Sequence, residues 1–279
     1  MGETLGGSAY LGYVATGTED SGNIKSLNDG ISLIIPAYNE ENRIRSTLEG
    51  YIPVLKSLGM PFEIIVVADG NDNTTKIAEE FSSSGVRAYR FNRRLGKGGA
   101  IKTGFCLSSF SVVGYVDADG SLAPRDLARL VAGLESSDCV IASRWIRGSV
   151  WTRKEPALKR SLSRLFNFLV RGLLGVPIYD TQCGAKFYRQ EILQRILPKV
   201  TVTNLTTDVD FLFHARKLGA TITEVPITWE DKEGSRFSMA RMVTLMLITV
   251  IGIRVMNLPL RDYVPDKLVH LFYAKYGNQ

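Results

Sequence analysis

The sequence predicts an α/β fold in which a mostly parallel sheet carries helices on both faces. From Ile31 onward, short apolar runs rich in Val and Ile alternate with longer segments whose apolar residues recur every three or four positions. The short runs are apolar almost throughout, as in strands that crossover helices bury on both sides. These two observations favour a single long α/β domain.

Strands are predicted at 31–36, 62–67, 86–90, 112–116 and 139–143, and helices at 40–59, 73–85, 96–109 and 123–136. The first helix has one apolar face, formed by Ile44, Leu48, Ile52 and Leu55. The second ends at Gly85, the third begins with "GKGG", and the fourth has Pro124 near its first turn, where proline is well tolerated.

The strand ends predict the position of a site. They read "PAYNEEN", "ADGNDNT", "NRRLGKGG", "DADGS" and "SRWIRG", in chain order, and each is polar, charged or glycine-bearing. In parallel sheets, ligands bind beyond the carboxyl ends of the strands. We therefore expect these segments to share one rim of the sheet.

Composition narrows the class of protein. The chain has 279 residues, 45% hydrophobic and 22% charged, and a net charge of +6 that favours anionic partners. Its three cysteines form no C-x-x-C pair and only two histidines are present, which argues against a disulfide framework or a structural zinc site. No nucleic-acid-binding motif is recognisable, so we expect no nucleic-acid partner.

Asp117 and Asp119 follow a predicted strand directly and are two residues apart, so both can face one side. Paired carboxylates suit a hard divalent cation, Mg²⁺ or Mn²⁺, shared with a diphosphate. The alternative is that they cap the next helix.

The "GKGG" segment (96–99) predicts a phosphate contact. It fits neither the P-loop nor the dinucleotide fingerprint. Lys97 and Gly98 at a helix start can still bind phosphate through the Lys charge and free backbone N–H groups. The alternative is that the small residues serve close helix packing.

Several segments in order carry a family resemblance: "SLIIPAYNEENRI", "EIIVVADGNDNT", "NRRLGKGGAIKTGF", "YVDADGS", "ASRWIRGS", "DTQCGAKFY" and "TTDVDFLFHARKLGATITEVPITWEDKEGSRF". Over residues 31–237 the chain resembles the inverting family 2 glycosyltransferases of the GT-A fold, in particular polyprenyl-phosphate (dolichyl-phosphate) hexosyltransferases. The resemblance implies a Rossmann-like sheet and metal-dependent transfer of a hexose from a nucleotide diphosphate sugar to a polyprenyl phosphate. It favours UDP-hexose over GDP-mannose.

The resemblance also implies residue roles. Asp117 and Asp119 would bind the metal and the donor diphosphate, and Arg144 would bind the acceptor phosphate. The nucleotide-sugar site would comprise Pro36, Tyr38, Glu40, Asp69, Lys97, Gly98, Ala118 and Gln182, with Asp117 and Asp119. Further cations for the acceptor phosphate would be Lys159, Arg160 and Arg236. The chain departs from the family at Ala68, where a second Asp is usual, and at Ala185, where a bulky aromatic is usual.

Asp208 separates two acceptor classes. In polysaccharide-making relatives its position resembles the general base that a hydroxyl acceptor requires. A phosphate monoester has a second pKa of about 6 and is largely dianionic at neutral pH, so it needs no base. Transfer to a saccharide hydroxyl is the alternative enzyme, and a silent nucleotide-sugar-binding or scaffold protein is the alternative of another class.

Two segments predict attachment at a membrane interface. Residues 157–174 place Leu158, Leu162, Leu165, Phe166, Leu169 and Leu173 on one helical face and Arg160, Arg164, Asn167 and Arg171 on the opposite one. The apolar run 242–253 would cover about 18 Å as a helix, which is too short to span a bilayer.

The expected organisation is a flexible tail (1–30), a GT-A domain (31–235) and C-terminal membrane-interface helices (236–279). The first 30 residues lack the pattern of a signal peptide, so we expect the cytoplasmic face of a membrane. The sequence leaves the oligomeric state open.

Overall fold

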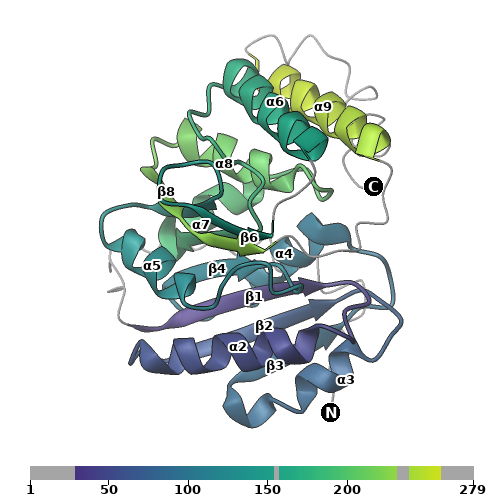
Figure 1. Ribbon diagram of the computed structural model, residues 1–279, viewed down its shortest axis with the longest axis vertical. Helices are drawn as coiled ribbons and strands as arrows, with labels where there is room; N and C mark the ends of the chain where they lie inside the picture. The colour runs from purple at the N-terminus through teal and green to yellow at the C-terminus, as the bar shows by residue number, and fades with distance from the viewer. Residues whose placement is uncertain (1–28, 154–156, 231–238, 259–279) are drawn as a thin grey trace.

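The computed structural model describes residues 29–153, 157–230 and 239–258 (Figure 1). Over these residues it contains a seven-stranded sheet in the order β3-β2-β1-β4-β7-β5-β8. The strands are β1 (Ile31–Ala37), β2 (Phe62–Ala68), β3 (Val86–Arg90), β4 (Val112–Val116), β5 (Cys139–Ser143), β7 (Ala185–Arg189) and β8 (Ile222–Pro226). The predicted α/β class with a mostly parallel sheet is confirmed.

β7 is the antiparallel member of this sheet. It pairs with β4 through Val113↔Tyr188 and with β5 through Val140↔Phe187, and both pairings are antiparallel. The amino end of β7 therefore lies at the same rim as the carboxyl ends of β4 and β5. This brings residues 182–184 to the edge where the polar strand ends gather.

Helices cover both faces of the sheet, as predicted. On one face lie α2 (Ile44–Ser57), α3 (Thr74–Glu79) and α5 (Asp126–Ala132), which share a buried apolar cluster with Leu33 and Val66. On the other face, α4 (Gly96–Cys106), α7 (Gln190–Ile196) and α8 (Thr207–Lys217) pack over Ile34 and Ile65. Alternate residues of each strand thus point into opposite core layers.

A small parallel pair, β6 (Val150–Arg153) and β9 (Thr228–Glu230), forms a second sheet. An isolated antiparallel bridge joins Leu122, just after the Asp117–Asp119 segment, to Trp229 of β9. The β6–β9 pair therefore connects to the carboxylate loop through the backbone.

Two further helices, α6 (Ala157–Leu174) and α9 (Met239–Met256), lie side by side at one end of the molecule (Figure 1). Phe166 and Val170 of α6 share a buried cluster with Met246 and Val250 of α9. Among the described helices, none is both long and apolar enough to cross a bilayer.

The predicted faces of α6 need a correction. Asn167, assigned to the polar face with the arginines, is buried and accepts hydrogen bonds from the N–H and hydroxyl of Thr181 at 2.8 and 2.7 Å. Phe166 is buried beside it, whereas Leu158 and Leu165 are 70% and 54% exposed. The helix buries one side against α9 and the core, so its leucine stripe faces outward.

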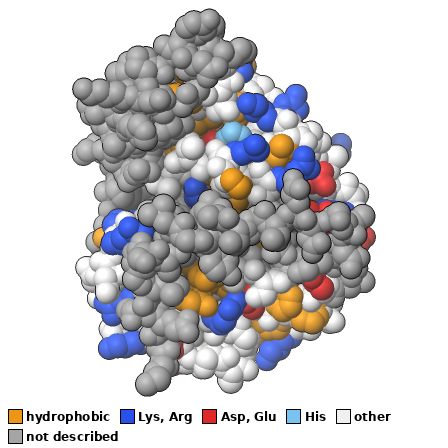
Figure 2. Space-filling model, turned by 180° about the vertical axis from the view of Figure 1, so that it is seen from behind, with side chains coloured by type: hydrophobic (Ala, Val, Ile, Leu, Met, Phe, Trp, Pro, Cys, Tyr) orange, Lys and Arg blue, Asp and Glu red, His pale blue; other side chains and the backbone are white. Residues whose placement is uncertain are grey.

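Other predicted segments lie partly outside the described residues. Residues 1–28 and 259–279 are among these, but Asp29 and Gly30, expected in the tail, are folded: Asp29 Oδ1 accepts the N–H of Ser111 at 2.8 Å. Figure 2 shows basic side chains at several separate places among the described residues of that face.

Candidate active site

The polar strand ends meet at one rim, as the sequence predicts. Asp117 follows β4 directly, and its N–H donates to the carbonyl of Gly184 at 3.0 Å. A Cβ at Gly184 would lie 1.9 Å from Asp117 Oδ2, so only glycine lets the two segments approach this closely. The "DTQCG" segment, predicted to lie by the donor sugar, is thereby placed against the carboxylate pair.

Lys97 and Asp117 form an ion pair, with Nζ 2.6 Å from Oδ1. Burial by itself would lower the pKa of Lys97, but the carboxylates of Asp117 and Asp208 outweigh it and hold this pKa above its usual value. For Asp117 the effect of burial is the larger one. Burial and the neighbouring Asp119 carboxylate raise the pKa of Asp117, and the opposing effect of Lys97 is too small to prevent this. One cation thus already faces the predicted metal-binding carboxylate.

The start of α4 does not offer the free backbone N–H groups that were expected to bind a phosphate. The N–H groups of Leu95 and Gly96 donate to Asp69 Oδ2 at 2.7 and 2.9 Å, and those of Gly98 and Gly99 to the carbonyl of Thr203. These four amides are therefore not free for a phosphate, because the chain itself caps them. A Cβ at Gly98 would lie 1.8 Å from Thr207 Oγ1, which supports the close-packing role of these glycines. The Lys97 side chain remains as a possible phosphate ligand.

Asp69 and Tyr38 are linked by an arginine that the sequence reasoning did not select. Arg94 forms an ion pair with Asp69, and its guanidinium carbon lies 3.5 Å from the centre of the Tyr38 ring. Tyr38 is 49% exposed and Asp69 is buried. Arg94 thus contacts both the exposed Tyr38 ring and the buried Asp69 carboxylate, and the "NRR" segment after the third strand was the sequence feature that could have indicated this.

The other predicted nucleotide-site residues also lie at or near this rim. Glu40 is bound by Arg43 through two hydrogen bonds of 2.6 and 2.8 Å, and burial raises the pKa of Glu40 although Arg43 opposes it. The carbonyl of Ala118 accepts the hydroxyl of Thr47 at 2.8 Å. Pro36 is the penultimate residue of β1 and is partly exposed at the carboxyl end of this strand.

Asp208 is enclosed beneath the rim. It is 4% exposed, accepts a hydrogen bond from the hydroxyl of Tyr115, and lies 3.5 Å from Lys186 Nζ. Lys186 is fully buried and also donates to Tyr115 Oη at 3.0 Å and to the carbonyl of Cys183 at 2.7 Å. Burial, with the nearby Asp208 carboxylate, raises the pKa of Tyr115, so the phenol keeps its proton. Lys186 and Tyr115 were not singled out from the sequence.

Arg144 follows β5 and is fixed by a buried carboxylate. Its Nε and Nη2 donate to Asp180 at 2.7 and 2.9 Å, and Asp180 is fully buried. A bidentate pair of this kind holds a guanidinium in one orientation. Arg144 is therefore held in one orientation with its charge paired to Asp180, which the sequence could not reveal.

The remaining predicted residues are more dispersed. Gln182 donates weakly to the carbonyl of Leu205 at 3.4 Å and approaches Met246 of α9. Lys159 and Arg160 lie in the first turn of α6. Arg236 lies outside the described residues.

The two carboxylates at the site could supply some of the ligands of a hard divalent cation. Within the described residues no group of three His, Cys, Asp or Glu side chains could hold a metal, which leaves Asp117 and Asp119 as a pair. Carboxylate oxygens suit Mg²⁺ and Mn²⁺, which commonly take further ligands from water and substrate phosphates. The residues present thus fit a metal that a diphosphate helps to hold.

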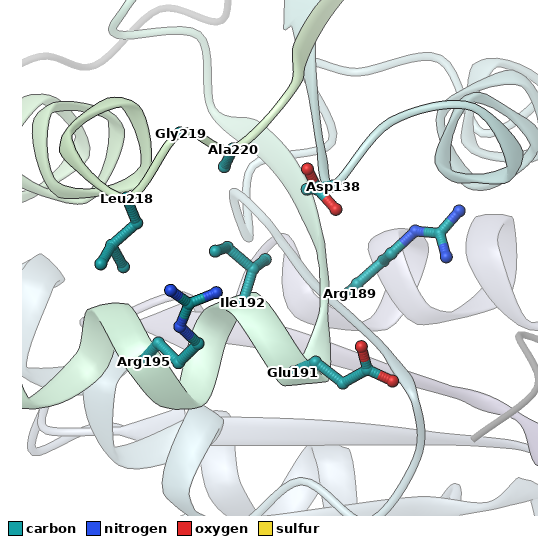
Figure 3. A pocket seen from close by; sticks show the side chains of 8 residues that line it. All are labelled: Asp138, Arg189, Glu191, Ile192, Arg195, Leu218, Gly219 and Ala220. Atoms are coloured by element: carbon teal, nitrogen blue, oxygen red, sulfur yellow. The ribbon is translucent and has the colours of Figure 1, made fainter. Parts of the chain in front are cut away.

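A pocket of about 160 Å³ lies elsewhere, at the amino end of β5 (Figure 3). Asp138, Arg189, Glu191, Ile192, Arg195, Leu218, Gly219 and Ala220 line it. Asp138 precedes β5, whereas the site follows the carboxyl ends of the strands. None of the predicted site residues lines this pocket.

Comparisons with known proteins identify the family of the chain. The model described as "Glycosyl transferase family 2" matches residues 32–197. The dolichyl-phosphate beta-glucosyltransferase of Dictyostelium discoideum is 33% identical over 240 residues, which cover 80% of this chain and 73% of that protein. The enzyme of the same name from Saccharomyces cerevisiae is 30% identical over 262 residues, covering 83% and 78%.

Among solved structures, glucosyl-3-phosphoglycerate synthase from Mycobacterium tuberculosis, in complex with Mn²⁺, uridine diphosphate and glucosyl-3-phosphoglycerate, superposes with a TM-score of 0.60. The match covers 86% of each chain at 18% sequence identity. At this identity the likeness concerns the fold.

Proposed function

Because the chain belongs to glycosyl transferase family 2 and is thus a glycosyltransferase, we propose that it transfers a hexose, with inversion, from a nucleotide diphosphate sugar to a polyprenyl phosphate. The names of the relatives support this acceptor class, since both are dolichyl-phosphate glucosyltransferases. A UDP-hexose is the favoured donor, in keeping with the glucosyl transfer that those names state.

The observation that carries the proposal is the burial of Asp208. A general base must reach the acceptor oxygen and then pass its proton on. Asp208 is 4% exposed and bound by Tyr115 and Lys186. A dianionic phosphate monoester attacks without losing a proton, so a site without a free base suits a phosphate acceptor better than a hydroxyl.

The chain's own residues then position the reactants. Arg144, oriented by Asp180, aligns the acceptor phosphate, and Lys97 binds the donor diphosphate. Asp117 and Asp119 would hold Mg²⁺ or Mn²⁺, which when bound stabilises the charge on the departing nucleotide diphosphate. Tyr38, stacked on Arg94, lies where a nucleobase or ribose can be received.

Attachment at the cytoplasmic face of a membrane is part of the proposal. Leu158, Leu165, Phe168 and Leu173 of α6 and Ile251 and Val255 of α9 are exposed apolar side chains on the helix pair. Apolar side chains flanked by the arginines of α6 suit a lipid interface. The described cysteines are unpaired, which suits a reducing compartment.

The test is a transfer assay with purified protein in detergent, Mn²⁺ or Mg²⁺, and labelled UDP-glucose, UDP-galactose and GDP-mannose. Each donor is offered with a polyprenyl phosphate, its dephosphorylated alcohol, or an oligosaccharide. The proposal predicts product with the phosphate alone and with a UDP-sugar. Product with the oligosaccharide and none with the phosphate would show that the hydroxyl alternative is correct. Stronger thermal stabilisation by GDP than by UDP would overturn the donor assignment.

A further inference from the structure

The Arg144–Asp180 pair leaves the acceptor site short of hydrogen-bond donors. Two nitrogens of the guanidinium are bound to Asp180, so the positive charge that would attract a dianion is largely compensated. A phosphate dianion withdrawn from water needs several donors to replace its hydration. Further donors for such an anion would be side-chain N–H groups near Arg144 that have no partner among the described residues.

All three tryptophans of the chain surround this guanidinium. Its central carbon lies 5.9 Å from the ring centres of Trp145 and Trp151 and 5.2 Å from that of Trp229. Trp151 and Trp229 are paired across the β6–β9 sheet, and the rings of Trp145 and Trp151 are 5.2 Å apart. The three indoles thus form one cluster around Arg144.

The indole N–H groups of this cluster differ in whether they have a hydrogen-bond acceptor. Trp151 donates to the carbonyl of Arg144 at 3.2 Å. The Nε1 atoms of Trp145 and Trp229 are buried and have no partner among the described residues, and Arg160 Nε on α6 is in the same state. A buried N–H without a partner is costly, so such a group commonly marks a place where a ligand supplies the acceptor.

A neighbouring cation adds to the cluster. The guanidinium of Arg164, one helical turn after Arg160, lies 4.8 Å from the ring centre of Trp145. The unpartnered N–H of Trp145 therefore belongs to a ring that lies near two arginines, Arg144 and Arg164, and the ligand that such a donor suits is an anion.

We propose that the indole N–H groups of Trp145 and Trp229 donate hydrogen bonds to the acceptor phosphate at Arg144, and this inference rests on the proposed function. β9 supports the placement, because the N–H of Glu230 donates to the carbonyl of Ser121 at 3.0 Å. Trp229 is thus carried by a strand that is bonded to the loop just after Asp119, which brings the acceptor phosphate towards the donor site. Neither indole nitrogen is solvent-exposed, so the phosphate reaches them only when adjacent atoms move.

The experiment compares Trp145→Phe and Trp229→Phe with Trp151→Phe in the full chain. Each change keeps an aromatic ring and removes an N–H, but in Trp151 the N–H already has an internal partner. Loss of a hydrogen bond to a charged ligand predicts an increase of about tenfold or more in KM for polyprenyl phosphate in the first two variants. KM for the donor should stay unchanged in all three, and Trp151→Phe should stay within about twofold of the wild type in acceptor KM.

Binding is measured separately from transfer, by quenching of tryptophan fluorescence with farnesyl phosphate and with farnesol. The proposal predicts saturable quenching by farnesyl phosphate and none by farnesol. It also predicts that Trp145→Phe and Trp229→Phe bind farnesyl phosphate more weakly than the wild type does. If Trp145→Phe and Trp229→Phe bind farnesyl phosphate as tightly as Trp151→Phe does, the inference is wrong. Wild-type protein that transfers to no polyprenyl phosphate would instead refute the proposed function.

The melting temperature of each variant is measured as the control for folding. If Trp229→Phe does not fold, 3-benzothienylalanine introduced at position 229 keeps the bicyclic shape and lacks only the N–H. Unchanged acceptor affinity in that protein would also overturn the inference.

Discussion

Lys97 Nζ lies 2.6 Å from Asp117 Oδ1, where a divalent metal would be expected to bind. The side chains are 24% and 28% exposed, so water screens the pair only in part. Lys97 thus competes with a metal for this carboxylate. Bound diphosphate offers Lys97 a second anion, so donor binding and metal binding should favour each other.

This relationship predicts opposite effects of Lys97→Met on two ligands. Without nucleotide, the variant should bind Mn²⁺ about fivefold more tightly, the equivalent of roughly 1 kcal/mol for a part-exposed ion pair. UDP-hexose should bind more weakly, because its diphosphate loses a cation. Mn²⁺ titrations followed by electron paramagnetic resonance measure the first effect and calorimetry the second.

The pH dependence of Mn²⁺ binding tests the Lys97→Met variant in a second way. Burial and Asp119 raise the pKa of Asp117, and Lys97 opposes them. Removal of Lys97 should therefore raise this pKa further, so that protons displace Mn²⁺ at a higher pH as the pH falls. Lys102→Met is the control, since Lys102 lies on the same helix and donates to the carbonyl of Val200 at 2.6 Å. Equal Mn²⁺ affinity in Lys97→Met and wild type would show that the ion pair does not oppose the metal.

Asp119→Ala should abolish transfer, because the metal loses one of two carboxylate ligands. The fold should survive with a modest loss of stability, about 1 kcal/mol, since the turn loses one hydrogen bond from the N–H of Ser121 at 2.9 Å. Turnover and melting temperature are measured on the same preparation over a range of Mn²⁺. Near-normal turnover at saturating Mn²⁺ would remove Asp119 from the metal site.

Gly184→Ala should lower kcat by about tenfold or more while the protein stays folded, because the new Cβ forces Asp117 away from its position. Gly172→Ala on α6 is the matched control, since a Cβ there meets nothing within 4 Å. Alanine in a helix should raise stability there by about 0.5–1 kcal/mol. Equal kcat values in the two variants would show that the Gly184–Asp117 contact has no catalytic consequence.

Leu165→Glu should weaken binding to anionic liposomes without lowering the melting temperature, because Leu165 is 54% exposed on α6. Ser57→Glu adds the same charge at an exposed position of α2 and should leave liposome binding unchanged. Co-sedimentation with phosphatidylserine vesicles measures both. Equal binding by the two variants would contradict an interfacial role for α6.

The sequence was sufficient for the five parallel strands β1 to β5, because buried parallel strands are marked by apolar runs and crossover helices by their periodicity, but β7 and β8 of the same sheet were not predicted. It was also sufficient to bring Asp117, Lys97 and Asp69 to one rim, since the carboxyl ends of parallel strands must meet there. It could not show that Asp69 caps α4, because a cap on a distant segment depends on tertiary placement.

Two further features depend on contacts that have no periodic signature. The enclosure of Asp208 results from Tyr115 and Lys186, on strands β4 and β7, and the antiparallel insertion of β7 was not predicted. The face of α6 was misassigned because a polar residue, Asn167, is buried to bind Thr181. Polar side chains that are buried and hydrogen-bonded inside the fold are thus the ones whose positions the sequence pattern did not predict.

The acceptor class is tested most directly by the single-turnover rate constant of wild type and Asp208→Asn with a polyprenyl phosphate, measured from pH 5 to 8. Both proteins should show the rate rising through about pH 6, as the monoester loses its second proton, and then levelling. The variant should keep this profile even if loss of the Lys186 contact lowers its rate throughout. A loss of about 10²–10⁴-fold together with loss of the pH-dependent rise is what removal of a general base produces. That result would contradict the account, because Asp208 would then act as a general base in a reaction that a dianionic acceptor should carry out without one.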